Sequence, residues 1–174
     1  TLSQSYRSTV EIIEFANSVL NAQGLGLKSA RPVLRHGEKP EVIKSASRRE
    51  SVRRIEEIVK RLNDKGKHSI AIITKTYGEG KVLERELKKH TDLDFTLIKG
   101  NEKESPNTDI IIIPAYLTKG LEFDGTIIYN PTEKNYPDNI LNQRLLYVAL
   151  TRALHSEYII AEEELSKNIN IEIS

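Results

Sequence analysis

The sequence predicts an α/β domain with a mainly parallel sheet of about six strands, covered by helices on both faces. Three short, continuous apolar runs support this prediction: SIAIIT at 69–74, DIIII at 109–113 and TIIY at 126–129. Uninterrupted β-branched runs of this kind are typical of strands buried on both faces of a parallel sheet. Segments with helical periodicity alternate with them, and strands that alternate with helices pair in parallel.

The individual elements follow from local patterns. The first predicted helix opens at the capping-box pattern Ser8-x-x-Glu11, and the second opens at Ser47-x-x-Glu50. Further helices are predicted at 79–90, 140–153 and 162–168. Strands are predicted at 41–46, 69–74, 95–98, 109–113, 126–129 and 157–161.

Composition indicates one globular domain spanning residues 1–174, because 38% of the residues are hydrophobic and 29% are charged. The chain has no Cys and four scattered His, so we expect neither disulfides nor a metal site of its own. It has no apolar run long enough to span a membrane and no signal-peptide pattern, which favours a cytoplasmic protein. The lack of Met favours a piece of a longer chain. A net charge of +1 restricts any contact with nucleic acid to a local surface.

Two loop segments contain residues suited to binding an anion or a nucleotide. Arg7, in QSYRST at 4–9, precedes a predicted helix N-terminus, where backbone N–H groups and the helix dipole favour anions. The alternative is a solvated surface arginine. In KGLEFD at 119–124, only Gly120 accepts a positive φ, and Glu122 is otherwise a solvated loop carboxylate. Ligands of parallel sheets bind beyond the carboxyl ends of strands, so we expect KGLEFD at that edge.

Arg152 ends a helical stripe of apolar residues. On the predicted helix 140–153, Leu141, Leu145 and Val148 are followed by Arg152 at i, i+4, i+7 and i+11. The stripe is predicted to face inward, and an inward arginine requires a partner. The alternative is a side chain that complements the helix C-terminus with its head group in water.

QSYRST, KGLEFD and QRLLYVALTRA (143–153), in this order, resemble the motifs that close one side of the ATP site in UvrD/Rep-type superfamily 1 DNA helicases. The resemblance covers essentially the whole chain and implies the second, C-terminal motor domain, with a RecA-like (P-loop NTPase-type) three-layer fold. The sequence lacks the GxxxxGK[ST] phosphate loop, and GEGK at 78–81 has too few residues before its lysine. The resemblance therefore implies half of an ATP site. The other half, with the Mg²⁺, belongs to an N-terminal RecA-like domain, and this chain alone is expected to be inactive.

The resemblance also assigns roles to individual residues. The implied nucleotide contacts are Tyr6 on the adenine, Arg7 on the γ-phosphate, Gly120 close to the ligand, Glu122 on the ribose, and Arg152 as the arginine finger. The implied contacts to single-stranded DNA are Lys119, Gln143 and Arg144.

Two departures from the family pattern bear on the substrate. The Thr-x-His element that commonly precedes KGLEF is replaced by PAYLT at 114–118. Residues 99–108 alone join two predicted strands where many relatives carry a large inserted subdomain. The chain is therefore most similar to the short helicase IV/HelD-like group. Two alternative functions stay open: a HelD-like factor that uses ATP to remodel RNA polymerase, and a catalytically dead α/β interaction domain.

Overall fold

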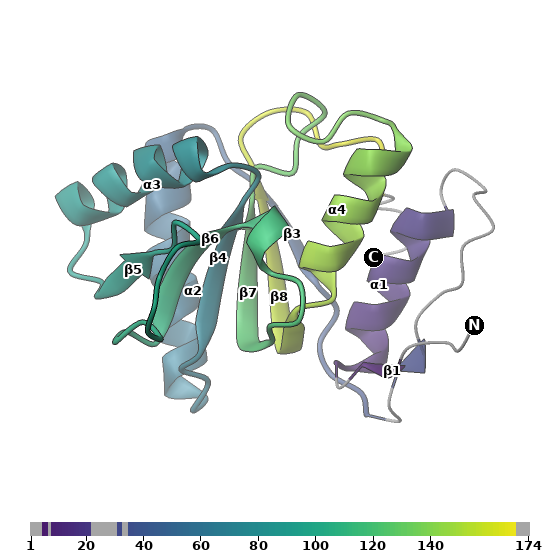
Figure 1. Ribbon diagram of the computed structural model, residues 1–174, viewed down its shortest axis with the longest axis horizontal. Coiled ribbons are helices and arrows are strands. Elements are labelled where there is room, and N and C mark those ends of the chain that lie inside the picture. Colours follow the sequence, from purple (N-terminus) through teal and green to yellow (C-terminus); the bar gives the residue numbers. More distant parts are fainter. Residues whose placement is uncertain (1–4, 7, 22–30, 33–34, 170–174) are drawn as a thin grey trace.

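The computed structural model describes residues 5–6, 8–21, 31–32 and 35–169. Its main sheet has six parallel strands in the order β3-β8-β7-β4-β6-β5 (Figure 1). These strands are β3 (Glu41–Lys44), β4 (Ile70–Thr74), β5 (Phe95–Leu97), β6 (Ile110–Pro114), β7 (Phe123–Tyr129) and β8 (Ala153–Ala161). A separate parallel pair is formed by β1 (Ser5–Tyr6) and β2 (Arg31–Pro32).

Helices cover both faces of the main sheet (Figure 1). α1 (Val10–Asn21) packs beside α4 (Ile140–Leu150) on one face, and α2 (Arg48–Asp64) packs beside α3 (Tyr77–His90) on the other. A 3₁₀ helix, η1 (Ala115–Leu117), follows β6. The predicted RecA-like α/β sandwich is therefore confirmed.

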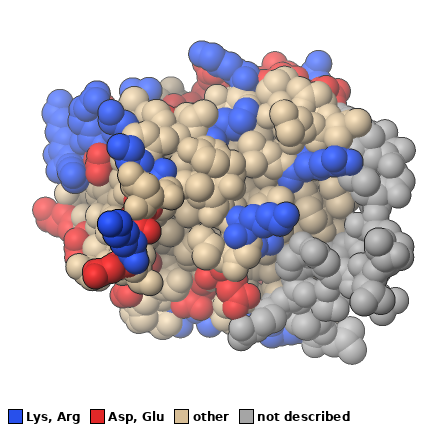
Figure 2. Space-filling view, in the orientation of Figure 1, with Lys and Arg blue, Asp and Glu red and all other residues tan. Residues whose placement is uncertain are grey.

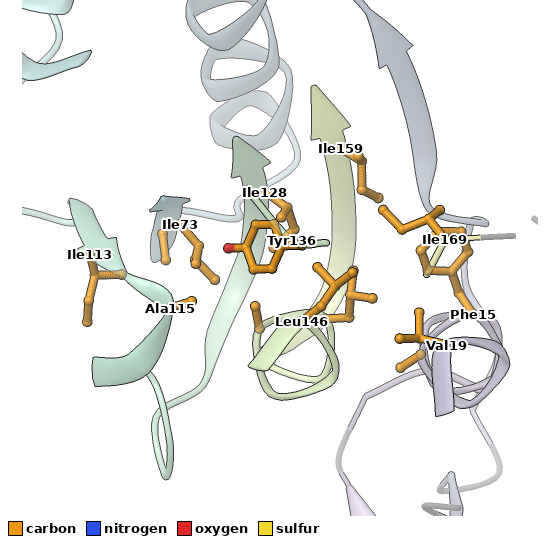
Figure 3. Packing of buried hydrophobic residues seen from close by; sticks show 14 of the residues in the cluster. Phe15, Val19, Ile73, Ile113, Ala115, Ile128, Tyr136, Leu146, Ile159 and Ile169 are labelled. Atoms are coloured by element: carbon orange, nitrogen blue, oxygen red, sulfur yellow. The ribbon is translucent and has the colours of Figure 1, made fainter. Parts of the chain in front are cut away.

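The central strand β4 shows why its apolar run is uninterrupted. Ile70 and Ile72 pack under α2 and α3, whereas Ala71 and Ile73 pack under α1 and α4. Successive side chains of a strand point to opposite faces, so a strand covered on both sides requires apolar residues at every position. Figure 3 shows the α1/α4 side of this core, where Leu146 of α4 meets the sheet. Burying one such side chain contributes about 1.5–3 kcal/mol.

The two capping-box patterns have different outcomes. Ser47 is the N-cap of α2, and its Oγ accepts a hydrogen bond from Glu50 N at 3.1 Å, as predicted. At α1, Thr9 takes the capping position, and its Oγ1 accepts a hydrogen bond from Ile12 N at 3.4 Å. Ser8 is buried against β8 and donates instead to the carbonyl of Ala153. A buried carbonyl requires a donor, and this contact outweighs the local capping pattern.

Two predicted helices change near the C-terminus. The predicted helix 140–153 ends at Leu150, so Arg152 lies between α4 and β8. Residues 162–168 form no helix. Leu165 instead forms an antiparallel bridge with Thr132, and Ser166 N donates to Pro131 O at 2.9 Å. Pairing with the loop after β7 satisfies the backbone groups that a helix would have satisfied internally. None of the described helices has both the length and the apolar character required to cross a bilayer.

Candidate functional site

The second half of KGLEFD lies at the amino edge of the sheet, so the prediction that placed it beyond the carboxyl ends is wrong. β6 and β7 run in the same direction, and the chain must return from the carboxyl end of β6 to the amino end of β7. η1 begins this return against α4. At its end, Phe123 N donates to Arg152 O at 2.9 Å, next to the first residue of β8.

Arg152 is the central residue of this edge. Its side chain is only 7% exposed. Nε donates to Val148 O at 2.8 Å, and Nη1 donates to Leu121 O at 3.0 Å and to Thr118 O at 3.5 Å. Nη2 donates to Thr151 Oγ1 at 3.1 Å. The guanidinium therefore completes the last turn of α4 and at the same time holds the backbone of the 118–121 loop.

The apolar stripe that led to Arg152 does not face inward, which corrects the sequence prediction. Leu141 is 77% exposed, and Leu145 and Val148 are half-buried. The buried residues of α4 are Asn142, Gln143, Leu146, Ala149 and Leu150. The inward position of Arg152 is correct for a different reason: the chain leaves the helix at Thr151 and turns into β8.

Residues 119–122 of the loop between η1 and β7 are exposed to solvent, whereas Thr118 is buried. Gly120 has a φ of +83°, as predicted for the tight turn, and a Cβ there would meet nothing within 4 Å. Lys119 and Glu122 are both exposed. The loop thus offers a cation, a carboxylate and an unobstructed glycine beside the buried Arg152.

The two N-terminal site residues lie largely outside the described structure. Arg7 falls outside the described residues. The backbone of Tyr6 belongs to β1, and its side chain is not described. The adjacent Ser8 does reach the start of β8, through the hydrogen bond to Ala153 O. The beginning of α1 therefore lies at the same edge as Arg152.

The predicted DNA-contact residues on α4 are separated by burial. Gln143 is fully buried, and its Nε2 donates to Val19 O of α1 at 2.7 Å. It fastens α4 to α1 and has no surface to offer a nucleic acid, which corrects its predicted position. Arg144 is exposed, as a contact to a phosphate requires.

The carboxyl edge above β4 and β7 is filled by the chain itself. Lys75 Nζ donates to Asn142 Oδ1 at 2.9 Å and to Asn135 O. Glu79 accepts hydrogen bonds from Lys75 N at 3.1 Å and from Asn135 Nδ2 at 2.9 Å. Burial raises the pKa of the Glu79 carboxyl and lowers that of the Lys75 ammonium. These bonds hold the loop after β7 over the place where ligands of parallel sheets usually bind.

Sequence reasoning missed a buried carboxyl group in β8. Glu157 is 3% exposed and receives one hydrogen bond, from Thr126 Oγ1 at 3.2 Å. Among the described residues its Oε2 has no partner. Desolvation holds the pKa of Glu157 well above its ordinary value of 4.5. Its neighbours in the sequence, Tyr158 and Ile159, are apolar strand residues, so the pattern alone gives no signal of a special role.

An exposed apolar surface adjoins this edge. We call it the η1–α4 face; it consists of Tyr116, Leu121, Leu141, Leu145 and Val148. Tyr116 is 57% exposed and Leu121 is 42% exposed. Figure 2 shows a broad region of uncharged atoms on this side of the molecule, crossed by few basic side chains. Tyr116, Leu121 and Leu141 are exposed, whereas Leu145 and Val148 are half-buried; exposed apolar side chains on neighbouring elements are typical of an interaction site.

The amino-edge residues suit the chemical groups of a nucleotide. Lys119 supplies a positive charge for phosphate, and the exposed carboxylate of Glu122 is an acceptor for ribose hydroxyls. Arg152 has the planar fork that binds phosphate in two contacts, but its four hydrogen bonds to described residues all go to oxygens of its own chain. The set fits a nucleotide on the condition that Arg152 exchanges these partners.

Comparisons with known proteins found similar families and solved structures. Residues 1–103 match the family described as UvrD-like helicase C-terminal domain, and residues 109–160 match a second family with the same description. The chain is similar to a crystal structure described as the C-terminal domain of a possible DNA helicase from Lactobacillus plantarum WCFS1. The identity is 27% and the TM-score 0.78, over 97% of this chain and 96% of the other.

A second structural match is more distant. It is a complex of the Arterivirus nonstructural protein 10 (helicase) with DNA, with 11% identity and a TM-score of 0.48, over 86% of this chain and 30% of the other. No curated protein sequence matches the chain.

Proposed function

Because the chain belongs to the UvrD-like helicase C-terminal domain family, we propose that it is the second RecA-like motor domain of an ATP-dependent DNA helicase or translocase. In this proposal residues 1–174 form one domain, and ATP binds in a cleft between it and an N-terminal RecA-like domain. Changes in the cleft during hydrolysis move the protein along single-stranded DNA. The chain alone is proposed to be inactive.

The observation that supports this proposal is the convergence at the amino edge. The start of α1 and the 118–122 loop are far apart in sequence, yet hydrogen bonds join the first to Ala153 of β8 and the second to Arg152, which directly precedes it. The η1–α4 face lies beside them. Apolar surface next to phosphate-binding chemistry is what a half-site requires if a second domain is to close over it.

Each residue of the edge receives one task in the proposed site. The bound ATP supplies the phosphoryl group that is transferred to water, with Mg²⁺ held by the N-terminal domain. Arg7 and Arg152 place positive charge at the phosphates, where negative charge develops during transfer. Tyr6 covers the adenine and Glu122 accepts a ribose hydrogen bond. Lys119 and Arg144 remain the candidates for contact with a DNA strand.

Arg152 must change partners to act on a phosphate. Its Nη1 donates to the carbonyls of Leu121 and Thr118, so the same hydrogens are unavailable to a ligand. The bonds from Arg152 to carbonyls already have a charged donor, but phosphate adds a charged acceptor and can accept two parallel N–H···O bonds from one guanidinium. The exchange is therefore favourable once a phosphate is close. Release of Leu121 and Thr118 would loosen the loop that contains Glu122.

The experiment is steady-state ATP hydrolysis by the protein that contains its N-terminal motor domain, with and without single-stranded DNA. We expect stimulation by DNA. Glu122→Ala removes the carboxylate that accepts a hydrogen bond from the ribose, and a bond to a charged group is worth about 1.5–3 kcal/mol, so KM for ATP should rise more than tenfold. Glu104→Ala is the matched control, because Glu104 is exposed on the 99–108 loop. Its kinetics should equal those of the wild type.

The same assay separates the alternatives. A HelD-like remodelling factor would hydrolyse ATP in response to RNA polymerase and not to single-stranded DNA. An inactive interaction domain would leave the longer protein without nucleotide turnover under any of these conditions. Either result, or an unchanged KM in Glu122→Ala, contradicts the proposed function.

A further inference from the structure

Positive charge is concentrated in one layer of the molecule. The whole chain has a net charge of +1, but residues 48–90, which form α2, β4 and α3, contain thirteen Lys and Arg and only seven Asp and Glu. The α2/α3 layer therefore has an excess of six positive charges, and the rest of the chain is acidic. Figure 2 shows Lys and Arg atoms gathered at the end of the molecule where α3 lies.

The charge is densest where α2 begins and α3 ends. We call this region the basic seam. It consists of Arg48, Arg49, Arg53 and Arg54 in the first two turns of α2, and Lys88, Lys89 and His90 in the last turn of α3. Cations in the first turn of a helix, here Arg48 and Arg49, oppose its dipole and cost about 0.3–1 kcal/mol each. Arg53 and Arg54 pair with Glu57, and Arg54 also lies within 3.9 Å of Glu41. Arg49 has no such partner, so local helix stability does not explain its position.

A pocket of about 390 Å³ lies within the basic seam. Arg49 and Arg53 line it from α2, and His90 lines it from α3. The remaining lining residues are Ser47, Glu50, Val52, Glu56 and Thr91. Arg53 also pairs with Glu57 at 3.1 Å. Within the described part of the chain, neither Arg49 nor Lys89 has a carboxylate within 4.0 Å.

We propose that the basic seam binds the phosphate backbone of a DNA strand, on the opposite face of the sheet from α4. Arg49 is exposed and lacks a carboxylate partner, so its paired N–H donors fit phosphate oxygens, and Arg53 beside it shares Glu57 with Arg54. That the polyanion is DNA rests on the proposed function; the phosphate chemistry rests on the seam itself.

An acidic protein is the competing occupant, and the surface composition argues against it. Protein interfaces depend on buried aromatic and apolar anchors, whereas backbone contacts to DNA do not. The exposed large apolar residues of the described structure are Tyr116, Leu121, Ile140 and Leu141. All four lie in η1, in the loop that follows it or in α4, and none lies in the basic seam. The basic seam has charge without an anchor, which suits a phosphate backbone.

The experiment measures binding of this chain to a fluorescent oligothymidylate by anisotropy as salt is varied. About four phosphate contacts predict a slope of log K against log salt of about −2.8, or roughly a 50-fold loss between 50 and 200 mM salt. Replacing both Arg49→Gln and Arg53→Gln should reduce the slope to about −1.4 and weaken binding about 25-fold at 0.1 M salt. Thermal melts of each variant confirm that the fold is retained.

The control replaces two other exposed cations, Lys39→Gln and Lys60→Gln, which lie outside the seam. It removes the same charge and should leave binding within about twofold of the wild type. Equal losses of DNA affinity in both double variants, or no loss in the Arg49/Arg53 variant, would overturn the proposal that the basic seam binds DNA. Displacement of DNA by polyglutamate at equal charge concentration overturns the choice of nucleic acid. Any of these results combined with DNA-stimulated ATP turnover would reject this inference and keep the proposed function.

Discussion

Replacement of Arg152 distinguishes a structural role of this side chain from a catalytic one. Its buried hydrogen bonds predict a larger loss of stability than a helix-end cation would give. A cation that only complements a helix end contributes at most about 1 kcal/mol. Arg152 instead is 7% exposed and makes hydrogen bonds of 2.8, 3.0 and 3.1 Å to Val148, Leu121 and Thr151, with a longer one to Thr118. Hydrogen bonds from a charged donor contribute about 1.5–3 kcal/mol each.

Arg152→Ala is therefore expected to lower the free energy of unfolding by about 3 kcal/mol, because water can reach part of the edge and replace some of the lost bonds. For a domain of this size the melting midpoint should fall by roughly 6–12 °C. Arg152→Lys keeps the charge and can reach one carbonyl, so it should cost about half as much. Arg144→Ala, at an exposed position of α4, is the matched control and should change stability by less than about 0.5 kcal/mol.

A catalytic role predicts that Arg152→Lys loses far more activity than stability. In the protein with both motor domains, an arginine finger contributes on the order of 10³–10⁵ to kcat. Lysine cannot reproduce the planar fork, so Arg152→Lys should lose most of this factor while it keeps much of the stability. The assay is ATP turnover at 25 °C, measured beside thermal melts of the same preparations.

Two results would refute this reasoning. Normal kcat in Arg152→Lys, with a lowered melting midpoint, would reduce Arg152 to a residue that fastens the loop to α4. A change of less than about 1 kcal/mol in Arg152→Ala would show that the buried hydrogen bonds do not stabilise the native state as calculated.

Three further predictions concern the chain itself. The isolated chain should fold but show no ATPase above the background of an Arg152→Ala sample, since it contains no GxxxxGK[ST] loop; turnover that a contaminant does not explain would contradict the half-site. Glu157 has a raised pKa, so its contribution to stability is complete below the ordinary pKa of 4.5 and is lost as pH rises toward the folded-state value. Glu157→Gln should therefore be more stable than wild type at pH 8 and gain little at pH 4.5, and equal gains at both would contradict the buried, protonated state. Gly120→Ala should cost about 1–2 kcal/mol because φ is +83°. Gly78→Ala, in the first turn of α3, should be neutral or stabilising, and a loss there equal to that at Gly120 would show that φ is not the cause.

The sequence by itself determined the layers of this protein. Apolar runs such as 69–74 identify strands buried on both faces, and an alternation of such strands with helices permits only a parallel sheet with covered faces. Local chemistry also determined the cap at Ser47 and the positive φ of Gly120, because both depend on a few neighbouring atoms. The motif residues of the 119–124 and 143–153 segments were recognisable for the same reason.

Tertiary structure decided where those residues lie. α4 is apolar on more than one side, so periodicity could not choose between Leu141 and Leu146, and packing against α1 placed Leu146 inside. The edge of the sheet at which Glu122 lies was decided by the path of the chain from β6 to β7, a connection that contains only the short helix η1. The partners of Arg152 include two carbonyls more than thirty residues away, which no local pattern encodes. Long-range burial and backbone hydrogen bonding set these positions, and they are satisfied only once the whole sheet has formed.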